Sequence, residues 1–331
     1  MRTKLVLLTG ALTAGLAILA ACSSDDKAAT IPPLDGGADA TGDVLGEASA
    51  GPLVGDGLAK AFCEKIAECT VFVDVAYGDL ATCSSRLGAQ LEKDIRLPGN
   101  TATQAEVDQC AQAVKASTCK DVLSNKLPAV CKKAGTLADG ATCGAGGQCA
   151  SQACHRTTDG GNCGSCGARF AAGATCVEND DCQDGLVCNK QKKCTAPPKD
   201  GEDCSQTDCE YGLACVSGKC AAALGENAAC TRTTDSDPCD LLGKGLVCLG
   251  GSCTKVGVAK AGQPCGLVGG TKFAVCGSNA HCDLADGSAE GVCAAILKEG
   301  DACDDAAGKK CLDPAKCVSG KCTLRDPTVC K

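Results

Sequence analysis

Apolar residues recur at helical spacing between residues 55 and 134. They form three stripes whose members lie three or four positions apart: Leu58, Phe62, Ile66 and Cys69; Leu80, Cys83, Leu87 and Leu91; and Val107, Cys110 and Val114. This spacing places the apolar positions of each segment on one face of a helix. Thr103 and Glu106 have the spacing of a capping box at the start of the third helix. The pattern therefore predicts a bundle of helices.

Six cysteines lie in the same region, several of them on the apolar stripes: Cys63, Cys69, Cys83, Cys110, Cys119 and Cys131. A disulfide that joins two helices must lie on faces that pack together. A short fourth helix is expected to start at Ser117 or Thr118, where a hydroxyl side chain can cap it. We therefore expect a six-cysteine helical domain over residues 55–134, held by three disulfides.

From Ala138 onward a cysteine repeat replaces the helical pattern. In most units a glycine stands three residues before the first cysteine, at Gly140, Gly173, Gly201, Gly262 and Gly300. Asn227 takes this place in the remaining unit, and asparagine is the residue that best tolerates a left-handed backbone after glycine. The position therefore predicts a turn with positive φ. A second signature, Gly-Leu-x-Cys, occurs at 185–188, 212–215 and 245–248, and "VSGKC" closes two units.

The repeat divides residues 135–331 into tandem modules, at about 138–166, 171–194, 199–220, 225–253, 260–293 and 298–331. Units of this size hold little more than short two-stranded ribbons and turns, and in such arrays contacts are mainly between neighbours. We therefore expect an elongated array. The connectivity of its cysteines stays open, but we favour an alternating order, such as Cys176 with Cys188 and Cys182 with Cys194. The cysteines of the three most regular modules are Cys176, Cys182, Cys188, Cys194, Cys204, Cys209, Cys215, Cys220, Cys303, Cys311, Cys317 and Cys322.

Composition favours a small disulfide-rich fold class. The chain has 33 cysteines in 331 residues, no Trp, two Tyr and four Phe. Ordering a module of ~25 residues costs roughly 1.5 kcal/mol per residue before apolar burial offsets it, which leaves the balance near zero. A disulfide contributes about 2–4 kcal/mol, so two in each module decide whether it folds.

The N-terminus predicts export and lipidation. Arg2 and Lys4 precede an apolar stretch that ends at Ala21, the pattern of a secretory signal over residues 1–21. A membrane-spanning anchor is the alternative, although the stretch is short for it. Leu19, Ala20, Ala21 and Cys22 resemble the lipobox of bacterial lipoproteins. That resemblance implies cleavage before Cys22 and a lipid on this cysteine, and Ser23 after it implies sorting to the outer membrane, on a face that stays undetermined.

Residues 22–54 follow as a lipidated cysteine and a disordered tether rich in Ala, Gly and Asp. If Cys22 carries lipid, 32 cysteines are left, an even number that could close 16 disulfides. The full chain has a formal charge of −8, and loss of Arg2 and Lys4 with the signal makes it −10. This charge argues against nucleic acid or anionic lipid as a partner.

The strings "CVENDDCQDGLVCNKQKKC" (176–194) and "CSQTDCEYGLACVSGKC" (204–220) resemble the Dickkopf N-terminal cysteine-rich module. The whole layout is similar to cysteine-rich outer-membrane lipoproteins of predatory and soil-living bacteria, although the module over 265–293 departs from the pattern. The resemblance implies extracytoplasmic binding or surface scaffolding without catalysis. The partners expected are the membrane, through the lipid on Cys22, and an unknown protein or polysaccharide ligand.

Other chemistries have weaker support. Cys154, His155, Cys163 and Cys166 could form a zinc site, and the C-x-x-C of Cys163 and Cys166 could act in thiol redox chemistry, but exported thiols are usually oxidised. Neither His155 nor His281 lies in a setting that favours hydrolysis. The acidic turn over 235–240 lacks the glycine and glutamate of a calcium loop. Inhibition of a secreted protease is a further alternative. We therefore expect no enzyme, no cofactor and no metal.

Overall fold

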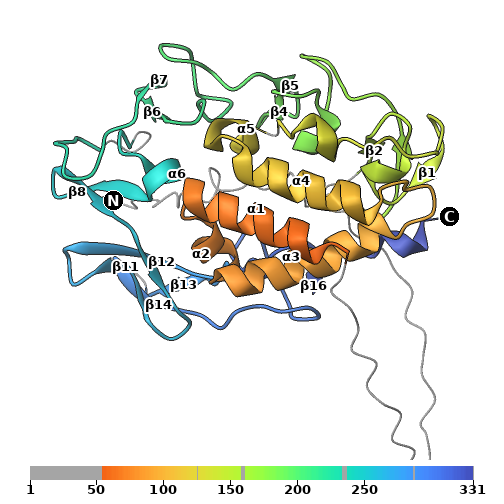
Figure 1. Ribbon diagram of the computed structural model, residues 1–331. Coiled ribbons are helices and arrows are strands. Elements are labelled where there is room, and N and C mark those ends of the chain that lie inside the picture. The colour runs from red at the N-terminus through yellow and green to blue at the C-terminus, as the bar shows by residue number, and fades with distance from the viewer. Residues whose placement is uncertain (1–53, 125, 158–160, 233–236, 286–287, 331) are drawn as a thin grey trace, which may run out of the picture.

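The computed structural model describes residues 54–124, 126–157, 161–232, 237–285 and 288–330. The expected signal, the lipobox with Cys22 and nearly all of the tether lie outside these residues. The described chain is a disulfide-rich fold with short helices, small sheets and 16 disulfides (Figure 1). No helix in this part of the chain is both long enough and apolar enough to cross a membrane.

Five helices come first in the described chain: α1 (Asp56–Cys69), α2 (Phe72–Tyr77), α3 (Leu80–Ile95), α4 (Gln104–Ala116) and α5 (Cys119–Leu123). In Figure 1, α1 lies between α3 and α4. The expected stripes meet in one buried cluster that includes Phe62, Leu87 and Val114. Leu80 is an exception, because it is the first residue of α3 and is 39% exposed.

Local signals set the starts of these helices. Thr103 and Glu106 form the expected capping box of α4, in which the Thr103 N–H donates to the Glu106 carboxylate at 2.9 Å. The Thr118 side chain accepts from the Asp121 N–H and caps α5, which is one of the two starts that the sequence allowed. Asp79 caps α3 in the same way, through the Thr82 N–H. Each cap satisfies a backbone donor that the first helical turn leaves unpaired.

Three disulfides join the helices of this segment. Cys63 of α1 pairs with Cys83 of α3, and Cys69 at the end of α1 pairs with Cys119 at the start of α5. Cys110 of α4 pairs with Cys131 in the short 3-10 helix η1 (Ala129–Cys131). All six cysteines expected in this region are thus used in three bonds between different elements.

Each of the six modules contains an antiparallel strand pair in which the third and fourth of its paired cysteines lie opposite each other. The strands are β1 (Thr142–Cys143), β2 (Cys154–His155), β3 (Gly164–Cys166), β4 (Val187–Cys188), β5 (Cys194–Thr195), β6 (Leu213–Val216), β7 (Lys219–Ala222), β8 (Leu246–Leu249), β9 (Ser252–Lys255), β10 (Gly257–Ala259), β11 (Pro264–Val268), β12 (Lys272–Cys276), β13 (Cys282–Leu284), β14 (Glu290–Cys293), β15 (Lys316–Val318) and β16 (Lys321–Thr323). The helix α6 (Leu241–Lys244) precedes β8.

Two modules are larger than the expected two-stranded ribbons. The first holds a three-stranded sheet in the order β1-β3-β2. The fifth, which has the irregular cysteine spacing, holds a five-stranded sheet in the order β10-β12-β11-β14-β13, with β10 and β12 parallel. Its longer spacing between cysteines provides the residues for the additional strands.

The turn predicted three residues before the first cysteine is present in all six modules. Gly140, Gly173, Gly201, Gly262, Gly300 and Asn227 all have φ between 64° and 88°. At each of these positions the backbone N–H donates to the carbonyl of the fourth cysteine, as from Gly201 to Cys220 at 2.7 Å and from Asn227 to Cys253 at 2.8 Å. The positive φ therefore directs the N–H toward the strand pair, and this hydrogen bond connects the start of the module to its last strand.

The modules do not form the expected elongated array. In Figure 1 they surround the helices, from β1 and β2 past β6, β8 and β11 to β16, and the C-terminus returns beside β1. Modules distant along the chain contact the helices directly: the Tyr211 hydroxyl donates to the Cys69 carbonyl at 3.1 Å, and the Asn279 N–H donates to the Val75 carbonyl at 2.8 Å. The expectation failed because a module this small buries little apolar surface alone, and contacts with the helices add to the contacts inside the module.

Candidate functional site

The cysteines expected in disulfides are all paired in the described residues. Four cysteines of each module pair in alternating order, and the remaining two, Cys163 and Cys330, bond each other. Cys176 bonds Cys188 and Cys182 bonds Cys194, which is the arrangement favoured from the sequence. The other modules repeat it: Cys143–Cys154 and Cys149–Cys166; Cys204–Cys215 and Cys209–Cys220; Cys230–Cys248 and Cys239–Cys253; Cys265–Cys282 and Cys276–Cys293; Cys303–Cys317 and Cys311–Cys322.

The C-x-x-C pair does not form its own disulfide. Cys163 bonds Cys330 near the C-terminus, whereas Cys166 bonds Cys149 within the first module. The redox alternative needs Cys163 and Cys166 to exchange with each other, and the zinc alternative needs thiolates on Cys154, Cys163 and Cys166. Because the three cysteines lie in three different disulfides, the arrangement supports neither alternative.

His155 joins the first module to the second. Its Nδ1 lies 2.8 Å from Asp181 Oδ1, and its Nε2 lies 3.2 Å and 3.0 Å from the carbonyl oxygens of Gly167 and Ala168. Its ring stacks on Phe170 with 4.1 Å between the centroids. Acceptors face both nitrogens, so the hydrogen bond with Asp181, first among several causes, raises the pKa of His155. A ring held in this way is occupied as a donor and is not placed to act as a general base.

Asp181 is almost fully buried beside this ring. Burial by itself would raise the pKa of its carboxyl, but hydrogen bonds from His155 and from the N–H groups of Val177 and Glu178 outweigh it and lower the pKa. The pair therefore favours a charged histidine next to an ionised carboxylate. Its role in the fold is to hold two modules together.

A second group of buried charges surrounds the carbonyl oxygen of Gly144. The guanidinium groups of Arg156 and Arg325 both donate to this oxygen. Arg156 also pairs with Glu178 of the second module, and Arg325 pairs with Asp94 of α3. Burial, only partly opposed by Arg156, raises the pKa of Glu178 to about 7. This network connects the first two modules, α3 and the C-terminal segment.

A cavity of about 250 Å³ lies beside this network, between the helices and the first two modules. Its helical side is largely apolar and includes Leu58, Phe62, Leu91 and Val107, together with Glu106 and Lys133. Its module side offers backbone and charged groups, from Gly146, Gly147, Ala153, Arg156, Arg169 and Asp180. A lining of apolar side chains with a few polar groups is the usual composition of a ligand site.

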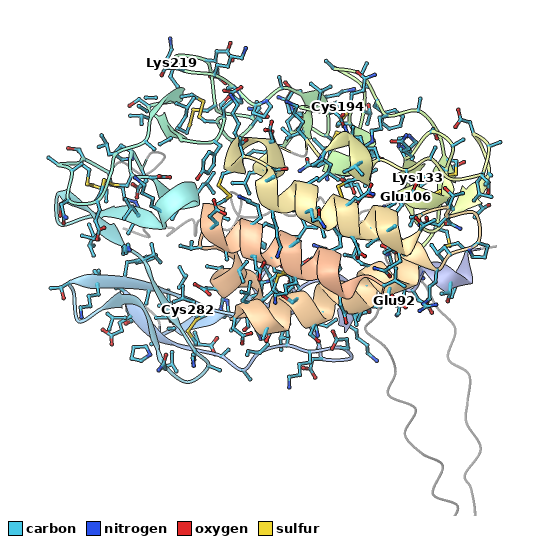
Figure 2. The ribbon with its side chains drawn as sticks, in the orientation of Figure 1. Glu92, Glu106, Lys133, Cys194, Lys219 and Cys282 are labelled. Carbon is cyan, nitrogen blue, oxygen red and sulfur yellow. A yellow bond between two sulfur atoms is a disulfide. The ribbon has the colours of Figure 1, made fainter. Side chains whose placement is uncertain are left out.

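An ion pair stands at the helical side of the cavity. Lys133 Nζ lies 2.5 Å from Glu106 Oε1, and Figure 2 shows the two side chains close together beside α4. The hydrogen bond from Lys133, together with those from Thr103, lowers the pKa of Glu106 to about 2. Glu106 thus combines two functions, because it caps α4 and also fixes a lysine at the edge of the cavity.

The described carboxylates of the acidic turn serve the backbone. Asp237 accepts from the N–H groups of Cys239 and Cys248 at 3.1 Å each, and Asp240 caps α6 through the Gly243 N–H at 2.8 Å. The second histidine, His281, has its Nε2 3.7 Å from Asp283 Oδ1. Asp237 also lies 3.6 Å from the Nε of Arg232, so backbone donors and an arginine contact the Asp237 carboxylate and a backbone donor contacts that of Asp240.

Sequence reasoning missed one recurring element of the modules. A residue six positions before the first cysteine runs beside the second cysteine, and in four modules it is a large apolar residue: Leu137, Phe170, Leu224 and Leu297. Each of these side chains packs against the cysteine cluster of its own module. Aligning the units on their first cysteine would have shown this offset. The partners of Arg156 and Arg325 leave no comparable signal, because they come from distant segments.

Comparison with protein-family models, with curated proteins and with solved structures finds no match for this chain.

Proposed function

We propose that this protein is a non-enzymatic lipoprotein of the bacterial cell envelope, anchored in the outer membrane through Cys22. On this proposal a tether connects the anchor to a helical bundle, and the six modules around the bundle form an extracytoplasmic domain for binding or scaffolding. The resemblance of residues 19–22 to a lipobox and of residues 176–220 to Dickkopf-type modules motivates this proposal.

The use of the cysteines is the observation that carries it. The described residues contain every cysteine of the chain except Cys22, and all of them are in disulfides. Such bonding needs an oxidising compartment. Cys22 is then the odd cysteine, as expected if its sulfur carries lipid.

Anchoring is tested with Cys22→Ala, and Ser24→Ala serves as the control. The wild type and Ser24→Ala should incorporate labelled fatty acid and sediment with outer membranes, whereas Cys22→Ala should lose the label. Label retained on Cys22→Ala would refute the anchor. Intact mass of the mature protein after alkylation without reduction should show no free thiol, and several alkylated thiols would refute the disulfide assignment.

The cavity beside α4 is the candidate contact site for the partner, which we expect to be a protein or polysaccharide. Ala102 lines the cavity, whereas Ala150 is exposed in the first module and does not line it. Ala102→Trp should therefore abolish capture of an envelope component by the soluble domain, and Ala150→Trp should leave it unchanged. Equal capture by both variants would place binding elsewhere. An assay against secreted proteases in the same preparation tests the inhibitor alternative.

A further inference from the structure

The disulfide between Cys163 and Cys330 differs from all others in the described residues by its exposure. Cys163 is exposed and Cys330 is partly buried. Every other described disulfide includes at least one buried cysteine. A reductant must reach a sulfur atom along the axis of the S–S bond, so access limits the rate of exchange. Among the described disulfides, this is the only one in which neither cysteine is buried.

The same bond closes the ring of modules. Its cysteines are 167 residues apart in the sequence, whereas no other described pair is separated by more than 50. It joins the first module to the C-terminal end of the sixth. All other described bonds lie within one module or within the helical segment.

Other contacts hold the C-terminal segment in place independently of the sulfurs. Arg325 is 2% exposed and pairs with Asp94 of α3. The Asp326 N–H donates to Asn162 Oδ1 at 2.9 Å, and Pro327 packs so closely on Gly144 that no Cβ would fit there. After reduction these contacts would keep Cys330 near Cys163, so the bond can form again.

We propose that Cys163–Cys330 is a thiol–disulfide exchange site, the first bond of this protein to react with a dithiol reductant. The thiolate of the dithiol attacks Cys163 Sγ, the S–S bond breaks, and Cys330 leaves as a thiolate that takes up a proton. The second thiol of the reductant then attacks the mixed disulfide. The dithiol becomes a disulfide, and Cys163 and Cys330 become two thiols by gaining two electrons and two protons.

The test is graded reduction of the folded soluble domain with dithiothreitol. Thiols are alkylated at each concentration and identified by peptide mass spectrometry. After the same short reaction time at each concentration, Cys163 and Cys330 should be half-labelled at a concentration about tenfold lower than that needed for any other pair, because access limits the rate of exchange. Labelling of another pair before this one, or of all pairs together, would overturn the proposal.

Two variants make the result specific. Cys163→Ser with Cys330→Ser should remove the early labelled pair without changing the labelling of the others, and Cys143→Ser with Cys154→Ser, which removes a buried pair, should leave the early labelling in place. Early labelling that persists in the first variant would also refute the proposal. If that variant fails to fold, the labelling order of the wild type still decides. The outcome is independent of Cys22, so it is separable from the anchoring proposal.

Discussion

Replacement of Gly201 by alanine tests whether the positive φ before the first cysteine holds a module together. Gly201 has φ of 78°, and a Cβ added to it would meet nothing within 4 Å. The cost of the substitution is therefore conformational, about 1–2 kcal/mol for an L-residue in the left-handed region. Gly201→Asn should cost less, because asparagine tolerates this region and Asn227 occupies it in the fourth module.

The assay is hydrogen exchange of single amides, because the many disulfides make a single global unfolding transition unsuitable. The Gly201 N–H donates to the Cys220 carbonyl, and the Cys220 N–H donates to the Glu202 carbonyl at 2.8 Å. If the turn loses 1–2 kcal/mol, the Cys220 amide should exchange roughly 5–30 times faster. Gly201→Asn should show a smaller increase.

Gly57 provides the matched control. A Cβ at this residue of α1 would also meet nothing within 4 Å, but its φ is not in the left-handed region. Gly57→Ala should therefore stabilise the helix, by about 0.4–1 kcal/mol, and leave the Cys220 amide unchanged. Unchanged exchange of Cys220 in Gly201→Ala, or an equal effect of alanine and asparagine, would refute the argument from φ.

Single contacts elsewhere make three further predictions. Arg325→Met should leave the partly buried Asp94 without its cation and destabilise the C-terminal segment by about 1–3 kcal/mol, seen as faster exchange of the Asp326 amide. Lys60→Met, at the largely exposed pair with Glu64, should cost less than about 1 kcal/mol. Leu246→Ala removes a fully buried side chain and should cost about 2–5 kcal/mol, measured on the amides of β8 and β9; no effect would contradict its role in the core. His155 and Glu178 both have pKa values raised by folding, so their stabilising contributions should be present below their unfolded pKa values and be lost as the pH rises through their folded pKa values, which for Glu178 is about 7. The Phe170 amide at this junction should then show protection that decreases with pH, and a Glu178→Gln variant with the wild-type profile would exclude Glu178 as a cause.

Local features were predictable from the sequence because their causes are local. The capping box at Thr103 and the turn at Asn227 each depend on residues within three positions, and the structure has both. The alternating order of Cys176 to Cys194 also involves one short segment. In each case only a few local conformations are compatible with the residues, so their spacing alone predicts the cap, the turn or the disulfide order.

The closed arrangement was not predictable, because its contacts join residues far apart. Cys163 lies three residues before Cys166, a spacing that allowed a redox pair, whereas the structure bonds Cys163 to Cys330. Nothing in the sequence around Arg325 distinguishes it from an exposed arginine, although its side chain is buried against α3. The cavity has the same origin, since helices and modules each supply part of its wall.

The ring and the helices depend on each other for stability. The helical segment buries Phe62, Phe72 and Tyr77 in its core, and the hydroxyl of Tyr211 in the third module donates to the Cys69 carbonyl at the end of α1. The modules contain disulfides but bury little apolar surface of their own, and they gain stability by packing on the helices. The segment around Arg325 then determines whether the last module stays on the first. A change that frees this segment should affect the junction and the neighbouring cavity before it affects the inner bonds of any module.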